Sequence, residues 1–411
     1  MAVAPSEPIL GFIRDNARWL AAGAMLMLSS SFGQTFFISI FAGEIRGAFG
    51  LSHGAWGGIY TIGTLASAVV MVWAGGLTDR FRVRHLATVV LVLLASVCLA
   101  MAAIPGAWAL PFVIFGLRLC GQGMLSHTAS VGLGRWFARS RGRANAIISM
   151  GFLTGESVLP FVFVLLMGVI GWRGGWVVAA GLALLFIPIL QFLLSAERKP
   201  GGDVNETQAP GMFGKHWTRA DALGHWLFWI AALAVASPSM FGTAYFFQQV
   251  HLTEIKGWEL AAFVALIPLY SSVSLASNFF FGGLADRFGT ALIFPVTMLP
   301  PVFAFAIVSY GETLWAAALA FVFIGMMQGG MSTISGAFWP EYYGTRHLGS
   351  VRAIAASAMV FGSAIGPGIT GYLIDFGVDY TTQLLAMSLY FLVLSCILAV
   401  SFRRARHYLN L

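Results

Sequence analysis

Two charged residues, Arg118 and Glu156, lie deep inside long apolar stretches of the sequence. A charge at the centre of a lipid bilayer costs about 2.5–3.5 kcal/mol on insertion scales, and such residues usually have a function. A guanidinium group can bind a carboxylate, and a buried carboxylate can exchange a proton. We therefore expect Arg118 to bind an anionic solute and Glu156 to carry a proton. The alternative is a fixed salt bridge between the two that only orders this part of the chain.

The elements that must position these residues follow from composition. The chain of 411 residues is 58% hydrophobic and 9% charged, with a mean hydropathy of +0.83, whereas soluble proteins carry about 25% charged residues. A helix needs roughly 20 apolar residues to span a bilayer, and it satisfies its own backbone groups in lipid. The sequence therefore predicts an all-α polytopic membrane protein with twelve transmembrane helices, at 17–42, 54–77, 86–104, 107–133, 143–169, 174–194, 221–248, 258–285, 289–310, 313–337, 351–374 and 380–401.

Lysine and arginine are divided unevenly between the two sides of these spans. Of 23 such residues, 19 lie on the side that holds both termini, and Arg46, Arg173 and Lys256 lie on the other. Because positive residues favour cytoplasmic loops, we expect both termini in the cytoplasm. The net charge of +7 is then a consequence of topology and does not indicate a nucleic-acid partner.

One short line of sequence is written twice, as AGGLTDRFR at 74–82 and FGGLADRFG at 281–289. The offset of 207 residues is about half the chain, and it also pairs Gly155 with Gly362 and Pro160 with Pro367. Two duplicated halves in the same direction are a known transporter plan. We predict a six-helix bundle at 1–194, a cytoplasmic linker at 195–220 and a second six-helix bundle at 221–411.

Over its whole length the chain resembles the major facilitator superfamily. The fourth span has the arginine of that superfamily's R-x-x-x-G-x-G pattern as Arg118, with Gln122 at the first glycine position and with Gly121 and Gly123 each one place before a glycine of the pattern. The stretch 134–147 is similar to the oxalate/formate and monocarboxylate branch. The loop between the second and third spans carries the superfamily's G-x-x-x-D-R-x-x-R/K pattern as Gly75, Asp79 and Arg80, with Arg84 one place beyond the last basic position. The resemblance implies two pseudo-symmetric bundles that work by alternating access.

The resemblance also gives the repeated loop a role. In the superfamily plan the cytoplasmic ends of spans 2 and 8 lie beside spans 11 and 5, whose N-terminal ends carry the positive half of the helix dipole. Asp79 and Asp286 would accept hydrogen bonds there and pair with arginine while the cytoplasmic side is closed. We call these two contacts the cytoplasmic latches, and we expect them to set the balance between inward and outward states. Their predicted residues are Asp79, Arg80, Arg139, Asp286, Arg287 and Arg346.

Uncharged polar residues inside the spans are candidates for solute contact. At ~100° per residue, Gln122 shares the face of Arg118, whereas His127 lies on the opposite face. We therefore expect His127 to pack elsewhere, against a neighbouring backbone, and not to serve as a proton site. In the superfamily plan spans 1, 4, 7 and 10 line the central cavity. The predicted contacts are Gln34, Gln122, Tyr245, Asn278 and Gln328, and the alternative for each is an ordinary hydrogen bond between helices.

Two departures from related families limit the substrate. The carriers resembled have basic residues in spans 8 or 11, whereas spans 7–12 hold none at membrane depth, which weakens a dicarboxylate interpretation. Drug/proton antiporters carry G-x-x-x-G-P in span 5, whereas span 5 here reads GFLTGESVLP at 151–160. That pattern occurs instead in span 11, as Gly362, Gly366 and Pro367.

Other classes of protein lack support in the sequence. There is no H-x-x-x-H spacing or cysteine cluster for a metal, and no G-x-x-x-x-G-K-[ST] motif for ATP. A channel would not need paired latches, and an assembly factor on this fold would be expected to lose its intramembrane charge. We expect no enzyme activity and no cofactor.

We therefore predict a secondary active transporter of a cell inner membrane, driven by an ion gradient. Its best-guess substrate is a monocarboxylate or related organic anion, and its expected partners are that solute, protons and the bilayer. We expect a monomer. The alternatives are a proton-driven drug or metabolite exporter of the same superfamily and a non-transporting membrane assembly factor.

Overall fold

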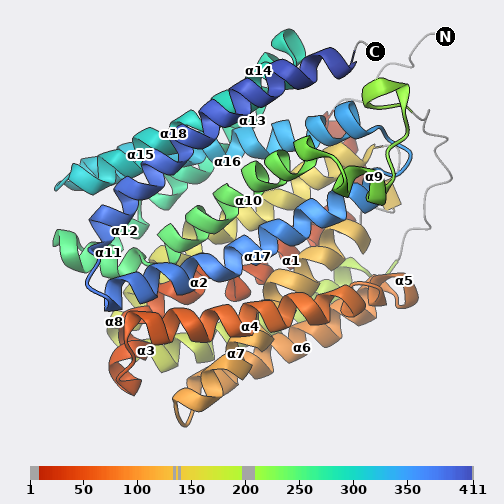
Figure 1. Ribbon diagram of the computed structural model, residues 1–411. Coiled ribbons are helices and arrows are strands. Elements are labelled where there is room, and N and C mark those ends of the chain that lie inside the picture. Colours follow the sequence, from red (N-terminus) through yellow and green to blue (C-terminus); the bar gives the residue numbers. More distant parts are fainter. Residues whose placement is uncertain (1–8, 133–135, 138–139, 197–208, 410–411) are drawn as a thin grey trace. The chain divides into compact units, whose positions relative to one another are not determined.

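The computed structural model describes residues 9–132, 136–137, 140–196 and 209–409, and within these every regular element is a helix (Figure 1). The helices fall into two compact units. The first contains Met1–Ile38 and Ala66–Asn205, and the second contains Ser39–Leu65 and Glu206–Leu411. The second unit therefore includes a short N-terminal segment as well as the C-terminal half. The predicted bundle and linker boundaries at 194 and 221 stay a prediction.

The first unit is built around its longest helix. Helices α1 and α6 both pack against α8, and α1 carries Arg18, which donates to the Phe192 carbonyl near the end of α8 at 2.9 Å. The elements of this unit are α1 (Ile9–Ser30), η1 (Ser31–Gly33), α2 (Thr35–Ile38), α5 (Leu77–Arg80), α6 (Val83–Ala102), η3 (Ala107–Ala109), α7 (Leu110–Leu117), η4 (Arg118–Leu125), η5 (Thr128–Gly132) and α8 (Arg141–Leu193).

The second unit contains the remaining elements. Its main helix pairs are α13 with α16, α10 with α17, and α15 with both α16 and α18. Helix α4 (His53–Ala74) begins in this unit and ends in the first. The other elements are η2 (Ser39–Phe41), α3 (Ala42–Phe49), η7 (Met212–Gly214), α9 (Arg219–Leu223), α10 (Trp226–Phe247), α11 (Gln249–Lys256), α12 (Leu260–Val264), α13 (Ile267–Phe288), α14 (Thr290–Val296), α15 (Leu299–Tyr310), α16 (Leu314–Tyr343), α17 (Leu348–Asp375), α18 (Tyr380–Ala405) and η8 (Arg406–Leu409).

The described residues contain ten helices long and apolar enough to cross a membrane, or eleven when the bent pair Leu10–Gly33 and Thr35–Phe49 is one span. One of these, Gly142–Leu193, has 52 residues. At 1.5 Å per residue it would be about 78 Å long, against a hydrocarbon core of ~30 Å. Gly171, with φ of 72°, interrupts it, between the predicted fifth and sixth spans. The multi-span helical architecture is confirmed, and the number twelve stays a prediction.

The end of the predicted linker is folded onto the second unit. The backbone N–H of Thr345 donates to the Ala209 carbonyl at 2.9 Å, and the ring of Trp217 packs edge-on against Tyr343. Helix α9 then starts with a capping box, in which Thr218 and Asp221 satisfy each other's backbone N–H groups. These contacts fix the entry into α10.

Candidate solute-binding site

The first membrane helix is broken at Gln34. Hydroxyl groups of Ser29 and Ser30 donate to the carbonyls of Met25 and Met27, and such bonds compete with regular helix. Gln34 is extended, with φ of −87° and ψ of 154°, and its carbonyl accepts the backbone N–H of Phe37 at 3.2 Å. In a continuous helix that N–H would bond to Gly33. The break therefore leaves the Gly33 carbonyl free for a side chain.

Arg118 is the side chain that uses this carbonyl. It is 1% exposed, and its Nη1 atom donates to Gly33 at 3.1 Å and reaches the Thr35 hydroxyl at 3.5 Å. Elements η1 and η4 can approach this closely only with glycine at both contact positions, because a Cβ on Gly121 would lie 2.6 Å from the Cα of Gly33. Sequence and packing together hold a guanidinium group inside the first unit.

Arg118 begins a π-helix, η4, and not an α-helix. The rotation per residue from Arg118 to Leu125 is therefore smaller than the ~100° of an α-helix, and the face shared by Arg118 and Gln122 stays a prediction. Gln122 is half-buried. π-helical turns occur frequently at functional sites. The helix change was not readable from the sequence, because the close packing around Gly33 and Gly121 is a tertiary feature.

His127 lies against the loop that carries the repeated motif. Its Nε2 atom is 3.2 Å from the Gly75 carbonyl and 3.5 Å from the Thr78 hydroxyl. The prediction that His127 packs against a neighbouring backbone is confirmed. Its position supports the loop structure.

Glu156 lies on α8 and is 6% exposed. The preceding residue, Gly155, sits so close to η1 that a Cβ there would overlap the Ser31 hydroxyl. Arg118 contacts the same broken segment at Gly33 and Thr35. Arg118 therefore contacts the broken segment directly, and Glu156 follows a glycine that packs against the same segment.

The predicted polar contacts of the second unit have different surroundings. Tyr245 is fully buried among aromatic rings, including Phe263 and Phe321, and its hydroxyl has no hydrogen-bond partner among the described residues. Asn278 accepts a hydrogen bond from the Thr333 hydroxyl at 2.8 Å, which joins α13 to α16. Gln328 on α16 is exposed. Their roles in solute contact stay predictions.

The residues of the cytoplasmic latches are only partly visible. The side chain of Asp79 and all of Arg139 lie outside the described residues. Asp286, near the end of α13, is exposed and forms no ion pair within the part of the chain that the structure describes. Three further members, Arg80, Arg287 and Arg346, are exposed as well. The latches stay predictions.

The structure contains an aspartate contact of the predicted kind at a position that we missed. Asp375, the last residue of α17, accepts hydrogen bonds at the beginning of α4 from the backbone N–H groups of His53 and Gly54, at 3.1 and 2.8 Å. The Ser52 hydroxyl donates to it at 2.6 Å. The sequence contained a signal for this contact, because an acidic residue directly follows the predicted span 11 and a serine precedes span 2 on the same side of the membrane.

The buried groups of the first unit could bind a solute and exchange a proton. No group of three or more His, Cys, Asp or Glu side chains that could hold a metal occurs in the described ranges. The first unit offers a buried guanidinium group, a buried carboxylate and a broken helix that the guanidinium group contacts. A buried cation suits a small solute with a negative or strongly polar group.

Comparisons with known proteins give a consistent result. The sequence profile described as Major Facilitator Superfamily matches residues 23–367 and 269–409. A protein of Thermoproteus tenax named "Uncharacterized 38 kDa protein in 23S RNA operon" is 25% identical over 367 residues, which cover 88% of this chain and 90% of that protein.

Two solved structures have a similar fold. One is a bacterial homolog of the human lysosomal transporter Spinster in an inward-facing, unoccupied conformation, with a TM-score of 0.69, 16% identity and 98% of both chains covered. The other is the nucleoside transporter NupG, with a TM-score of 0.69, 13% identity, and 96% of this chain and 99% of that chain covered. At such identities the likeness concerns the fold alone.

Proposed function

Since the chain belongs to the Major Facilitator Superfamily, and is thus a membrane transporter and not an enzyme, we propose that it moves a small organic anion with a single carboxylate by alternating access. The observation that carries this proposal is the burial of Arg118, 1% exposed, at the broken first helix. Its Nη1 atom donates to the Gly33 carbonyl and reaches the Thr35 hydroxyl. A guanidinium group at this position can bind a carboxylate.

Proton coupling through Glu156 is the second part of the proposal. Arg118 contacts Gly33 and Thr35, and Glu156 follows a glycine that packs against Ser31, so binding of an anion at Arg118 would change the electrostatic surroundings of Glu156. An ion gradient must drive uphill transport, because the sequence contains no ATP-binding motif. Glu156→Gln should abolish the pH dependence of transport. Normal transport with unchanged pH dependence in this variant would exclude the coupling role.

The transport cycle would use contacts at helix ends. We propose that the cytoplasmic latches form in one state of the cycle, and that the bonds from Asp375 to the beginning of α4 belong to the opposite state. In this proposal both kinds of contact place an aspartate at a helix N-terminus, where a negative charge is stabilising. In this proposal the transporter works as a monomer in a cell inner membrane, with both termini in the cytoplasm.

The experiment that tests the substrate class is a thermal-shift screen of the purified protein. Small carboxylates, amino acids, sugars and cationic drugs are compared on wild type and Arg118→Ala. A ligand at 100 times its Kd stabilises the folded state by about 2.7 kcal/mol. A carboxylate that stabilises wild type but not Arg118→Ala would support the proposal.

The same screen distinguishes the proposed function from its main alternative, an exporter. If only neutral or cationic compounds stabilise wild type, Arg118 and Glu156 neutralise each other and have a structural role. A proton-driven exporter of drugs or metabolites would then be the better interpretation, consistent with the G-x-x-x-G-P pattern at Gly362, Gly366 and Pro367 in α17.

A further inference from the structure

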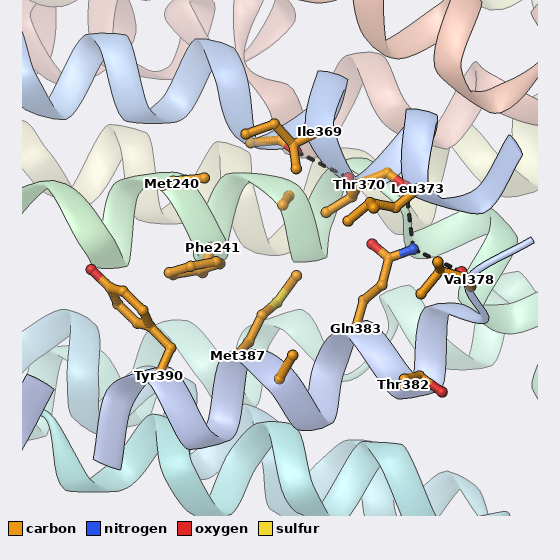
Figure 2. A pocket seen from close by; sticks show the side chains of 13 residues that line it. Met240, Phe241, Ile369, Thr370, Leu373, Val378, Thr382, Gln383, Met387 and Tyr390 are labelled. Atoms are coloured by element: carbon orange, nitrogen blue, oxygen red, sulfur yellow. Dashed lines mark hydrogen bonds between the residues drawn. The ribbon is translucent and has the colours of Figure 1, made fainter. Parts of the chain in front are cut away.

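A cavity of about 300 Å³ lies within the second unit, among α10, α17 and α18 (Figure 2). Its walls are apolar side chains from all three helices, and none of the lining residues is charged. The main wall residues are Met240, Phe241, Ile369, Leu373 and Met387. The cavity includes neither of the buried charges of the proposed transport site, which belong to the first unit.

One polar atom in this apolar wall has no hydrogen-bond partner among the described residues. Gln383 is 4% exposed, and its Nε2 atom donates to the carbonyls of Thr370 at 3.4 Å and Val378 at 3.0 Å. Its Oε1 atom is buried without a hydrogen bond. These two carbonyls fix the amide orientation, because a flipped amide would place oxygen against oxygen. Figure 2 shows the amide oxygen of Gln383 turned away from Val378, toward the side of Met387.

Two other polar groups of the cavity, the hydroxyls of Thr370 and Tyr390, are already bonded. The Thr370 hydroxyl donates to the Gly366 carbonyl at 3.0 Å and accepts from Gln248 at 3.2 Å. The Tyr390 hydroxyl is 2.7 Å from the Ser237 hydroxyl. A buried acceptor without a donor is unfavourable. A ligand that fills the cavity and brings one donor to Gln383 would remove this cost.

The cavity opens on the outer surface of the unit, away from α4. On α17 the residues that meet α4 include Ala364, whose carbonyl accepts from Thr61, and Pro367, which touches Gly57. At ~100° per residue the cavity residues Ile369 and Leu373 lie on the other face. They are 43% and 37% exposed. In a membrane-spanning helix, such apolar side chains face hydrocarbon, so a ligand would enter from the lipid.

We propose that this cavity binds a neutral single-chain lipid whose hydroxyl group donates to Gln383 Oε1, with monoacylglycerol as the fitting class. Gln383 lies three residues into α18, about 5 Å from its first residue, and Tyr390 lies about 10 Å deeper. A hydroxylated head near the membrane surface and a chain running inward match this arrangement. The proposal does not depend on which solute the protein transports.

Charge and size exclude other lipid classes. A fatty-acid anion or a phospholipid head would meet an unpaired amide oxygen and no cation. Ligand pockets range from about 300 to 1,000 Å³, so this cavity is at the lower end and suits one chain rather than two. A hydrocarbon chain without a donor would fill the volume but leave Gln383 Oε1 unsatisfied.

The test uses the full chain in phosphatidylcholine nanodiscs, because that lipid has no hydroxyl donor. The probe is 1-monooleoylglycerol with a photoreactive diazirine in its acyl chain, and cross-linked peptides are mapped by mass spectrometry. We expect cross-links on α17 and α18 around Leu373 and Met387. Unlabelled monooleoylglycerol should compete roughly three- to tenfold better than methyl oleate, since one hydrogen bond distinguishes them.

Two variants and a control complete the experiment. Ala386→Phe fills the exposed side of the cavity and should reduce cross-linking at least tenfold, whereas Leu389→Phe, exposed on the same helix but outside the lining, should not. Gln383→Met should remove the preference for the hydroxylated lipid. If Gln383→Met does not fold, cross-linking of Ala386→Phe still shows whether the lipid binds in this cavity. Equal competition by methyl oleate, or full labelling of Ala386→Phe, would overturn the proposal.

Discussion

The carboxylate of Asp375 lies 2.8 Å from the backbone nitrogen of Gly54, although the two residues are 321 positions apart in the chain. It closes the first turn of α4, where backbone N–H groups have no partner within the helix. The Ser52 hydroxyl and the His53 N–H group donate to the same carboxylate. A single side chain at the end of α17 therefore satisfies the beginning of a helix from the N-terminal part of the sequence.

Asp375→Asn should weaken this contact without breaking the fold. Asparagine still accepts a hydrogen bond, but the charge next to the helix dipole is lost. Such a charge is worth about 0.3–1 kcal/mol at an exposed helix end, which corresponds to a two- to fivefold change in an equilibrium constant. If the contact opens during transport, a cysteine placed at Ser52 should react correspondingly faster with a membrane-impermeant thiol reagent in Asp375→Asn.

Asp379→Asn is the matched control for this prediction. Asp379 is an exposed acid four residues further along, at the beginning of α18, and its side chain forms no capping bond. Its replacement should leave the labelling rate unchanged. Equal labelling rates in wild type and Asp375→Asn would show that the contact is permanent and is no part of a conformational cycle.

Gly121→Ala should destabilise the first unit. The added Cβ would lie 2.6 Å from the Cα of Gly33 and 2.7 Å from its nitrogen, and backbone atoms cannot move aside cheaply. Overpacking of this kind costs about 1–3 kcal/mol. Gly181→Ala on α8 is the control, since nothing lies within 4 Å of its added Cβ and alanine favours the helix by roughly 0.5–1 kcal/mol.

The two glycine variants are compared by the thermal stability of the purified protein. A lower midpoint for Gly121→Ala together with an equal or higher midpoint for Gly181→Ala is expected. If Gly121→Ala were as stable as wild type, the crossing of the first helix and η4 could not be as close as the structure gives it.

The apolar runs predicted the membrane helices well, because span length and hydropathy are local properties of the sequence. The burial of Arg118 and Glu156 could also be predicted, since each is a charge in an apolar run. The π-helix from Arg118 to Leu125 could not, because it depends on how two backbones approach. The face that Gln122 shares with Arg118 therefore stays a prediction.

The Asp375 contact illustrates a second limit. The positive half of a helix dipole attracts any acidic residue nearby, so the sequence indicates that helix ends and acids will meet. It does not indicate which acid meets which end, because that depends on the packing of α4 against α17. The analogous assignments of Asp79 and Asp286 relied on resemblance, and they stay predictions.

Arg118→Lys should abolish transport while the protein still inserts and folds. Lysine keeps the charge but lacks the planar fork that binds a carboxylate in two places, and its ammonium group cannot reproduce the geometry at Gly33 and Thr35. We expect transport of a carboxylate in proteoliposomes to fall at least tenfold. Unlike Arg118→Ala, the lysine variant keeps a positive charge at this position, so its stability should stay closer to wild type. Transport at the wild-type rate would remove Arg118 from the substrate site.

The pH dependence of stability should depend partly on His251 in α11. Burial, and then the neighbouring Arg46, lower the pKa of His251 from its usual 6.5. The ring also lies 4.2 Å from the ring of His53 and 3.9 Å from Glu254, while Tyr380 packs nearby. Between the lowered pKa and 6.5 the unfolded chain binds more protons at this residue than the folded chain, so stability must fall as the pH falls through that range.

His251→Gln removes this titrating group, so its thermal midpoint should decline less than that of wild type between about pH 7 and about pH 5. His407→Gln, an exposed histidine near the C-terminal end of the described chain, is the control and should follow wild type. The comparison is made on purified protein at constant ionic strength, because Arg46 and Glu254 act on His251 through charge. Parallel pH curves for wild type and His251→Gln would mean that the folded protein accommodates a protonated His251 without cost, and that acid sensitivity arises elsewhere.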